Sequence, residues 1–420
     1  MAVGAGLSSS FGIAAETTPG TPVAVTRFIE LESTTLKGTK KTVQGMGFRQ
    51  GGQVPRAVRR SLVARTAGGD VQFDPTTNGF GLFLQYMLGS TVTPTLLSGA
   101  LYQQIHNVGS LIGKSFTTQV VKPDTTGVLT QQAYTYPGCK ITDWELSVKA
   151  DEQVQLKLTI DALDEATPSN AFAATVLSSA VTAGASTIST AATIPTGSYV
   201  VIDTGSLAEV VQTTGTVTGA GPYVSTLTAP TKQAHATGVY VGSATGVNYG
   251  AAVALQAASY SATSTEFNYT QGSLISGGTT TTIAGVYTNT GGTVVGNVRS
   301  ITVTGKNALA VNRTQLGSMI RNEQIDNGWR EYTADIEVEF NNRASYDAYM
   351  ADAGTALQLS FTGPGGAKLS IYAPAAFQED GGQPDVSNAD IIVLKQKYTF
   401  LDDGVNGAIQ VVYVSTDTAL

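Results

Sequence analysis

Histidine and cysteine, the side chains most often used for nucleophilic or metal chemistry, are scarce in this chain. Its 420 residues include two histidines, His106 and His235, and one cysteine, Cys139. Two imidazoles cannot form a three-histidine metal site, and they leave only two candidate bases for a nucleophilic triad. Neither histidine lies in a suggestive motif, so both are predicted to be ordinary surface or turn residues. Cys139 has no neighbouring base and is predicted to pack beside Trp144 as a small apolar side chain.

Glycine-rich and acidic segments do not supply a ligand site either. The stretches SGGTTTT, TGGTVV and TGPGGAKL lack the glycine and lysine spacing of phosphate-binding loops, and hairpin turns explain them better. The acidic run with Glu379, Asp380, Asp385 and Asp390 lacks the spacing of an EF-hand loop and is predicted to be a solvated loop. Nothing favours a carboxylate pair for glycoside hydrolysis. The sequence therefore predicts no catalytic, cofactor-binding or metal-binding residue, and a protein that is not an enzyme.

The composition favours β structure over helix. Charged residues make up 13% of the chain and glycine occupies 47 positions, and the runs rich in Thr, Val, Ser and Gly suit strands and turns. The net charge of -7 opposes a basic surface that wraps nucleic acid, because such binding needs Lys and Arg to displace counterions. No stretch reaches the roughly 18 apolar residues of a membrane helix. The first residues lack a signal-peptide pattern, so a cytoplasmic protein is expected.

Alternating and helical patterns locate the main elements. In residues 152–161, Val154, Leu156, Leu158 and Ile160 share one face, which predicts a half-buried strand. In residues 331–340 the apolar face carries Tyr332, Ala334, Ile336, Val338 and Phe340, and the opposite face carries Thr333, Asp335, Glu337 and Glu339. Helices are predicted at about 78–88, capped by Thr76, Thr77 or Asn78, and at about 343–352. Each helix follows a strand, which indicates a weak internal duplication.

Charge density indicates an inserted segment. Between Ala171 and Val298 the charged residues are only Asp203, Glu209, Lys232 and Glu266, whereas both flanks have ordinary charge density. Residues 174–243 consist of short strand patterns separated by turns, which is typical of a small β-barrel or β-sandwich. We therefore predict a mainly β host with two short helices, formed by residues 1–170 and 246–420 and split by an inserted β domain over residues 171–245.

The segment from Lys37 to Arg60 is strongly basic. It has little strand pattern, and structureless loops of this length are usually functional. One explanation for this segment and the acidic C-terminal flank is two solvated faces. The other is head-to-tail stacking, which needs opposite charges at opposite ends of a subunit. The candidate stacking residues are Lys37, Lys40, Lys41, Arg49, Arg56, Arg59 and Arg60.

The order of several short motifs resembles the major tail tube proteins of long-tailed, siphovirus-type bacteriophages, especially those infecting actinobacteria. The opening FGIAAETTPGTPVAVTRFIELES is similar to that family's start at Gly12, Glu16, Thr17, Gly20, Thr21, Pro22, Arg27 and Phe28. The stretch AGGDVQFDPTTNGFGLFLQYMLGS resembles its strand and outer helix. The later stretches NYTQGSLISGG, VRSITVTGKNAL and NGWREYTADIEVEFNNRASYDAYMADAGTALQLSFTG look like the closing half of the domain. The middle segment resembles a β module inserted in various virion proteins.

The resemblance implies a β-sandwich subunit whose inner sheet joins those of its neighbours into a barrel. It implies hexameric rings stacked into a tail tube, through which genomic DNA passes without specific binding, and no cofactor. The partners would be other copies, the tape measure protein, the tail terminator and distal tail or baseplate proteins, in a virion assembled in the host cytoplasm. An acidic lumen would repel phosphates, and the candidate lumen residues are Asp335, Glu337 and Glu339. The loop at about 37–60 would bridge rings, and the inserted domain would be surface-exposed.

Two rival classes of function remain open at this stage. A Thr- and Gly-rich β protein is also compatible with a carbohydrate-binding or adhesive surface protein, which would not stack without limit. A polysaccharide-degrading enzyme ranks last, because the sequence has no β-helix rungs and no convincing acid pair. Within the same class, a terminator or distal tail protein would stop at one ring.

Overall fold

The computed structural model describes most of the chain and confirms the mainly β class. The described residues are 6–124, 130–165, 174–196, 198–203, 207, 209–216, 221–228, 230–243, 256, 258–261, 263–380, 382–384, 386 and 391–420. In these residues the chain contains antiparallel strands and two α-helices, α1 (Gly81–Leu88) and α2 (Ala344–Met350). Both helices fall inside the ranges that the sequence predicts.

The strands fall into three groups along the chain. The N-terminal flank contains β1 (Ser10–Ala15), β2 (Arg27–Ile29), β3 (Ser33–Thr34), β4 (Lys37–Gln44), β5 (Arg60–Phe73), β6 (Thr95–Ser98), β7 (Leu101–Asn107), β8 (Phe116–Asp124), β9 (Thr130–Lys149) and β10 (Gln155–Ala162). The middle segment contains β11 (Thr175–Val176), β12 (Thr187–Thr190), β13 (Tyr199–Ile202), β14 (Glu209–Thr216), β15 (Tyr223–Leu227) and β16 (Tyr240–Ser243). The C-terminal flank contains β17 (Gly272–Ser276), β18 (Thr279–Ile283), β19 (Val286–Thr290), β20 (Thr293–Val294), β21 (Val298–Lys306), β22 (Leu309–Ala310), β23 (Ile325–Asp326), β24 (Glu331–Glu339), β25 (Thr355–Thr362), β26 (Lys368–Asp380), β27 (Val393–Leu401) and β28 (Gln410–Ser415).

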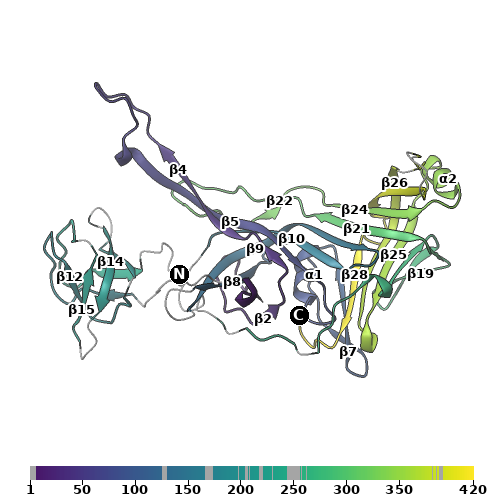
Figure 1. Ribbon diagram of the computed structural model, residues 1–420, viewed down its shortest axis with the longest axis horizontal. Helices are drawn as coiled ribbons and strands as arrows, with labels where there is room; N and C mark the ends of the chain where they lie inside the picture. The colour runs from purple at the N-terminus through teal and green to yellow at the C-terminus, as the bar shows by residue number, and fades with distance from the viewer. Residues whose placement is uncertain are drawn as a thin grey trace.

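Strands from both flanks join into one hydrogen-bonded network of 18 strands. Its central run has the order β4-β5-β10-β9-β21-β24-β27-β26, and every pair in it is antiparallel. Among the described strands, two pairings connect the N-terminal flank to the C-terminal flank: β9 with β21, and β7 with β28. The two flanks therefore form one body, which Figure 1 shows as a sheet extended along the long axis.

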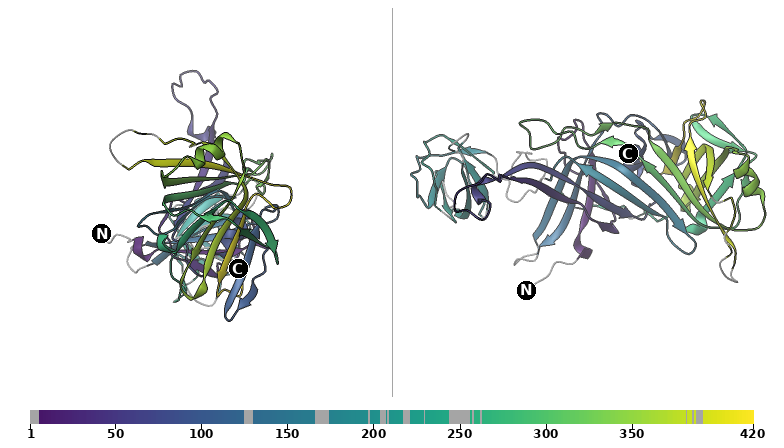
Figure 2. Two further views of the ribbon diagram at one scale, coloured as in Figure 1. Left: turned by 90° about the vertical axis from the view of Figure 1, so that its right-hand side faces the viewer. Right: turned by 90° about the horizontal axis from the view of Figure 1, so that it is seen from above.

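The middle segment forms a separate sheet. Strands β11 to β16 pair only with one another among the described strands. Their buried side chains, such as Leu177, Ile188 and Val200, form a hydrophobic cluster distinct from that of the body. Figures 1 and 2 draw this sheet at one end of the long axis and the strands of the C-terminal flank at the other.

The alternation that the sequence shows matches burial in the body. In β10, Leu156, Leu158 and Ile160 are buried, while Lys157 between them is exposed. In β24 the apolar residues are buried and Asp335 is exposed. Phe340 follows the end of β24 and is more exposed than predicted. One face of the central sheet thus covers the core, and the other is polar.

Aromatic packing explains the position of α1. The ring of Phe73 in β5 lies 5.1 Å from the ring of Phe11 and 5.2 Å from that of Phe83 in α1. All three side chains are fully buried, and burial of each contributes about 1.5–3 kcal/mol. The helix ends at Gly89, whose positive φ of 92° suits glycine and lets its N–H bond to the Gln85 carbonyl. The predicted side-chain cap was wrong: Phe80 stands at the N-cap and makes no side-chain hydrogen bond.

The basic segment Lys37–Arg60 is not a structureless loop, so that prediction was wrong. Strand β4 pairs with β5 from Lys37 opposite Gly68 to Gln44 opposite Arg60. The resulting hairpin projects from the body at the upper left of Figure 1. The residues of β4 are mostly exposed, so no buried apolar face marks the strand in the sequence. Its pairing with the longer β5 holds it in place.

Candidate functional surfaces

The tip of the projecting hairpin, residues 45–59, combines exposed apolar side chains with positive charge. Its fully or mostly exposed apolar residues are Met46, Phe48, Val54 and Val58. Hydrogen bonds from side chains to backbone carbonyls hold the shape of the tip. The Arg59 guanidinium donates to the Gly47 carbonyl at 2.9 Å. The Gln44 amide donates to the Arg56 carbonyl at 2.9 Å. Exposed apolar residues bordered by charge are typical of a protein–protein contact surface.

The basic candidates divide between the strands and the tip of this hairpin. Lys37, Lys40 and Lys41 lie in β4, and all three are exposed. Arg49, Arg56 and Arg59 lie in the tip, and Arg60 begins β5. The structure thus gathers all seven predicted stacking residues on one projection from the body.

The acidic candidates share the polar face of β24, as their alternation predicts. Asp335 is exposed, and Glu337 and Glu339 are partly exposed. Their cross-strand neighbours are basic: Lys397 lies opposite Asp335, and Lys395 lies opposite Glu337.

An ion pair completes the charge compensation on this face. The Arg299 guanidinium on β21 lies 2.8 Å from a carboxylate oxygen of Glu339. This face is therefore mixed in charge rather than acidic alone. This pairing of acidic with basic side chains could not be predicted from the sequence, because it depends on which strands pair and in which register.

A buried carboxylate organises the N-terminal turn. Glu16, which is 7% exposed, accepts hydrogen bonds from the backbone N–H groups of Gly20 and Gly138, each at 2.8 Å. It also accepts from the hydroxyls of Ser115 at 2.6 Å and Thr117 at 2.8 Å. One side chain thus fixes the turn after β1 to the start of β8 and the middle of β9. Sequence reasoning identified Glu16 only through the family resemblance.

A second residue of the opening motif holds the end of the described chain. The Arg27 guanidinium in β2 donates to the carbonyls of Ala419 at 3.1 Å and Leu420 at 2.7 Å. It also lies 3.6 Å from the Asp417 carboxylate. Arg27 thus ties β2 to the segment after β28, across nearly the whole length of the chain.

Both histidines are buried, so their prediction as surface or turn residues was wrong. His106 in β7 is fully buried, and burial lowers its pKa to about 3, so it is neutral at physiological pH. His235 lies in the middle segment between two carboxylates. Its Nε2 is 2.7 Å from a Glu209 oxygen, and its Nδ1 is 3.3 Å from an Asp203 oxygen.

The His235 cluster is a structural clamp for the inserted sheet. Glu209 also accepts backbone N–H groups from Lys232 at 2.7 Å and Gln233 at 3.2 Å. These bonds fix the segment 231–235 to the β13–β14 hairpin, and the pairing of His235 with Val181 ties it to the segment between β11 and β12. Asp203 and Glu209 flank the turn of that hairpin, so one imidazole closes it against the rest of the module.

Replacing His235 with alanine is expected to destabilise the inserted sheet by about 2 kcal/mol, because two partly buried carboxylates lose their common partner. Limited proteolysis should then cut within residues 174–243 faster than in the unchanged protein, while the body stays resistant. Lys232→Ala is the matched control, because only its backbone contacts Glu209. Equal cleavage rates in H235A and K232A would contradict the clamp.

Cys139 is buried, as predicted, and it is not set up as a nucleophile. Its thiol donates to the Tyr136 carbonyl at 3.1 Å, and burial raises the pKa of the thiol well above its usual value. The reactive thiolate is therefore suppressed. No group of three or more His, Cys, Asp or Glu side chains suited to a metal ion occurs among the described residues. Asp385 and Asp390 of the acidic run lie outside the described residues.

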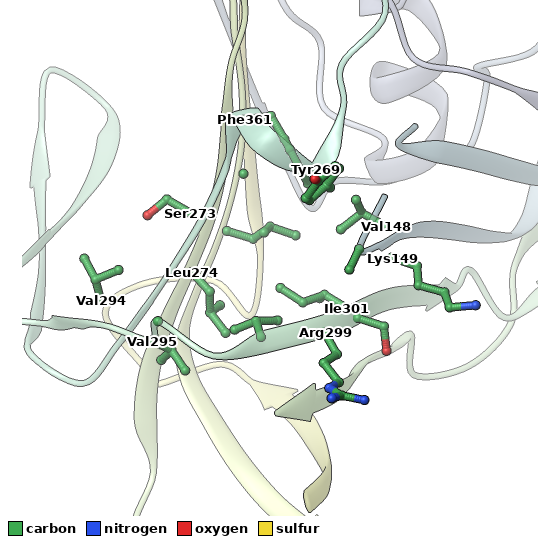
Figure 3. Close-up of a pocket in the computed structure, with 16 residues that line it drawn as sticks. Val148, Lys149, Tyr269, Ser273, Leu274, Val294, Val295, Arg299, Ile301 and Phe361 are labelled. Carbon is green, nitrogen blue, oxygen red and sulfur yellow. The ribbon is translucent and has the colours of Figure 1, made fainter. Parts of the chain in front are cut away.

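A cavity lies where the two flanks meet. It has a volume of about 250 Å³ and is lined by the end of β9 and by residues of β17, β20, β21 and β25. Figure 3 shows apolar side chains such as Leu274 and Ile301 on its walls, with Lys149 and Arg299 beside them. Its lining contains no histidine, cysteine or carboxylate, so it offers no acid–base pair.

Comparison with known protein families identifies the chain. A family model described as a phage tail tube protein matches residues 6–400. The chain belongs to the phage tail tube protein family. No curated protein sequence matches it. As a phage tail tube protein it is a structural component of the virion tail and not an enzyme, which confirms the family that the sequence motifs indicate.

Family membership also fixes the broad kind of partner. Tail tube proteins assemble with copies of themselves and with other tail proteins. Within the described residues, no helix has both the length and the apolar character needed to cross a membrane.

Proposed function

We propose that copies of this chain close into rings that stack into the tail tube, and that the tube conducts genomic DNA into the host. The observation that carries the proposal is the central sheet. One face of it buries the core, and the other is polar and extends across both flanks from β5 to β27. A sheet with this division suits a wall with a water-filled lumen on one side, and closure into a ring protects its edges. The resemblance implies a hexameric ring.

Negative-stain electron microscopy of the purified protein over a range of concentrations tests this function. Hollow tubes or stacked rings are the expected result. Single closed rings at every concentration would favour a terminator or distal tail role instead. Compact particles that do not associate, even with tape measure and initiator proteins added, would contradict the proposal.

The hairpin tip is the proposed contact between stacked rings. It combines exposed apolar side chains with exposed basic ones, and its arginines suit the acidic residues of the C-terminal flank. In this proposal the tape measure, tail terminator and distal tail or baseplate proteins contact the assembled tube at its inside and its two ends.

We propose that the polar face of β24, with Asp335, Glu337 and Glu339, lines the lumen. The lysines opposite these residues mean that the acids offset basic neighbours rather than create a strongly negative wall. DNA would then slide because neither sign of charge dominates.

Replacing Asp335 and Glu337 with lysine is expected to make the tube bind DNA, because Lys395 and Lys397 already lie opposite them. Four adjacent lysines should raise affinity for a short duplex about tenfold at low salt, with a steeper salt dependence. Fluorescence anisotropy with duplex present during assembly measures this change. The control E30K/E32K makes the same change in net charge at exposed positions outside β24. Equal DNA binding by the two variants would refute the lumen assignment.

The inserted sheet is proposed to project from the outer surface of the tube. Because its core is distinct from that of the body, deletion of residues 174–243 with a short linker should leave tube formation intact. Electron microscopy should show tubes with a smaller outer diameter. Loss of all soluble protein on deletion would show instead that the module supports the body.

A further inference from the structure

The two flanks of the body repeat one strand order. We call residues 6–165 the first half and residues 263–420 the second half. In the first half the central strands run β4-β5-β10-β9, and in the second half they run β21-β24-β27-β26. Helix α1 follows β5, and helix α2 follows β24, the matching strand.

Three further strands of each half match as well. In the first half β1 pairs with both β2 and β8, and β8 pairs with β9. In the second half β17 pairs with both β20 and β25, and β25 pairs with β26. Each half therefore contains one unit of the same topology, with seven strands and one helix, which is a much closer repeat than the sequence patterns indicate.

The register of the pairings supports this equivalence. Ser33 lies opposite Gln72 in the first half, and Ser300 lies opposite Glu337 in the second. Five residues further on, Gly38 lies opposite Ala67, and Gly305 lies opposite Tyr332.

The irregularities of the two halves also match. The β9–β10 pairing and the β26–β27 pairing each contain one register shift. In both, the shift lies next to the aspartate at this level of the strand: Asp143 faces Thr159 in the first half, and Asp380 faces Lys397 in the second. Bulges are specific local features, so their coincidence indicates that Asp143 and Asp380 are equivalent positions.

Two pairings join described strands of the halves: one, which we call the junction, extends the central sheet, and the other joins β7 to β28. Strand β9 of the first half pairs with β21 of the second, from Lys149 opposite Ser300 to Asp143 opposite Lys306. Gly305 leaves room for Trp144, because a Cβ atom there would lie 2.3 Å from the indole ring. The cavity of Figure 3 lies at the other end of this junction.

A connecting segment strengthens the junction. Residues 307–330, between β21 and β24, lie against the first half. There the Arg321 guanidinium lies 2.9 Å from an Asp161 oxygen, and the Lys140 ammonium lies 2.6 Å from a Glu323 oxygen. Arg321 and Lys140 are buried, so this contact belongs to the interior of the protein rather than to its surface.

Within the described residues, the outer edge of the first half, β4, lacks the second partner strand that the matching strand β21 has in β9. Strand β4 occupies the position of β21, yet among the described strands it pairs only with β5. The last turn of α2 is also exposed to solvent. Tyr349 and Met350 are 36% and 63% exposed, whereas Tyr86 and Met87 near the end of α1 are 3% and 1% exposed.

We propose that the contact between chains repeats the junction inside the chain: β4 of one copy pairs with the end of β26 of the next. Thr39 of one copy would then face Asp380 of its neighbour, as Lys306 faces Asp143. The charges suit this contact, because Lys37, Lys40 and Lys41 lie in β4, while the facing end of the neighbour carries Asp347, Asp352, Glu379 and Asp380. Edge pairing also removes an exposed strand edge.

The proposal rests on the ring described above and changes the number of its subunits. Each chain supplies two units, so a ring of six units is completed by three chains rather than by six. In this arrangement the strands of the hairpin act within the ring, and its tip is left for the contact between rings.

Disulfide trapping of the double variant T39C/D380C tests the junction. Antiparallel partners have Cα atoms about 4.5–5.5 Å apart, which a disulfide spans, and the native Cys139 is buried and cannot compete. After oxidation of assembled protein, non-reducing electrophoresis should show covalent dimers and trimers and no larger species. Each single variant should remain monomeric. The control D143C/K306C should form a bond within one chain and give no ladder.

The outcomes separate this proposal from the proposed function. A ladder that stops at three chains supports both the junction and the count. A ladder that continues to six, or no ladder from protein that forms tubes in the electron microscope, overturns the three-chain ring and leaves the tube function standing. If the unchanged protein forms no tubes with its initiating partners, the proposed function itself fails.

Discussion

Replacing Glu16 with alanine is expected to lower the free energy of unfolding of the body by about 3–5 kcal/mol, the range seen when one partner of a buried charged contact is removed. The substitution leaves four donors without an acceptor: two backbone N–H groups and two hydroxyls. Two of them, on Ser115 and Thr117, are in fully buried residues, so water cannot readily replace the carboxylate. Few single substitutions in this chain remove so many contacts at once.

Urea unfolding followed by tryptophan fluorescence measures this effect. Trp144 is buried in the body and Trp329 is exposed, so the change in emission reports mainly on the body. Glu30→Ala is the control, because Glu30 is an exposed acidic residue in the same segment. Glu16→Gln keeps the size of the side chain but brings an amide donor to a site filled with donors, so it should fall between the two. A midpoint for E16A equal to that of E30A would show that the four contacts are dispensable.

The elements that could be predicted from sequence are those in which one chain segment carries its own signal. The alternation in β10 and β24 reflects a buried face and an exposed face within each strand, so it identifies both strands without any knowledge of their neighbours. Helix α1 is identified in the same way by apolar residues at helical spacing and by Gly89 after its last turn. These signals are local, and local signals are what a single sequence contains.

The features that could not be predicted depend on pairing between distant segments. Strand β4 is exposed on most of its residues and is held by β5, so its composition is that of a loop. His235 is buried because Asp203 and Glu209, more than twenty residues away, converge on it.

The charge balance of the β24 face depends on register in the same way. Lys395 and Lys397 are more than fifty residues from the acids that they face. The acidic row could be found in the sequence, but its compensation could not, because a shift of one residue would place both lysines on the other face of the sheet.

The structure shows what two charged residues of the N-terminal family motif do. Glu16 and Arg27, two of the positions that carry the resemblance, each make several contacts to parts of the chain about 100 to 390 residues away. Two of the four partners of Glu16 and two of the three partners of Arg27 are backbone groups. Such contacts fix the path of the chain rather than the packing of the core.

Reversing three charges of the hairpin, in the variant R56E/R59E/R60E, is expected to abolish tube formation while the rings remain. All three side chains are exposed, so the fold of the body should not depend on them, although the bond from Arg59 to Gly47 within the tip is lost. Placing like charges across a contact costs several kcal/mol. A cost of about 3 kcal/mol would raise the concentration needed for tube growth by roughly 100-fold. Sedimentation and negative-stain electron microscopy measure the fraction of protein in tubes.

The variant R56K/R59K/R60K is the matched control, because it keeps the charge and changes only the shape of the head groups. It also tests one structural detail, since Arg59 donates to the Gly47 carbonyl within the tip and lysine cannot reproduce the guanidinium geometry. Tubes from the lysine variant and none from the glutamate variant would establish that charge drives stacking. Tubes from both would exclude the tip arginines from the contact. Loss of rings together with tubes in the glutamate variant would place these arginines in the contact within the ring, where β4 and β5 are proposed to act.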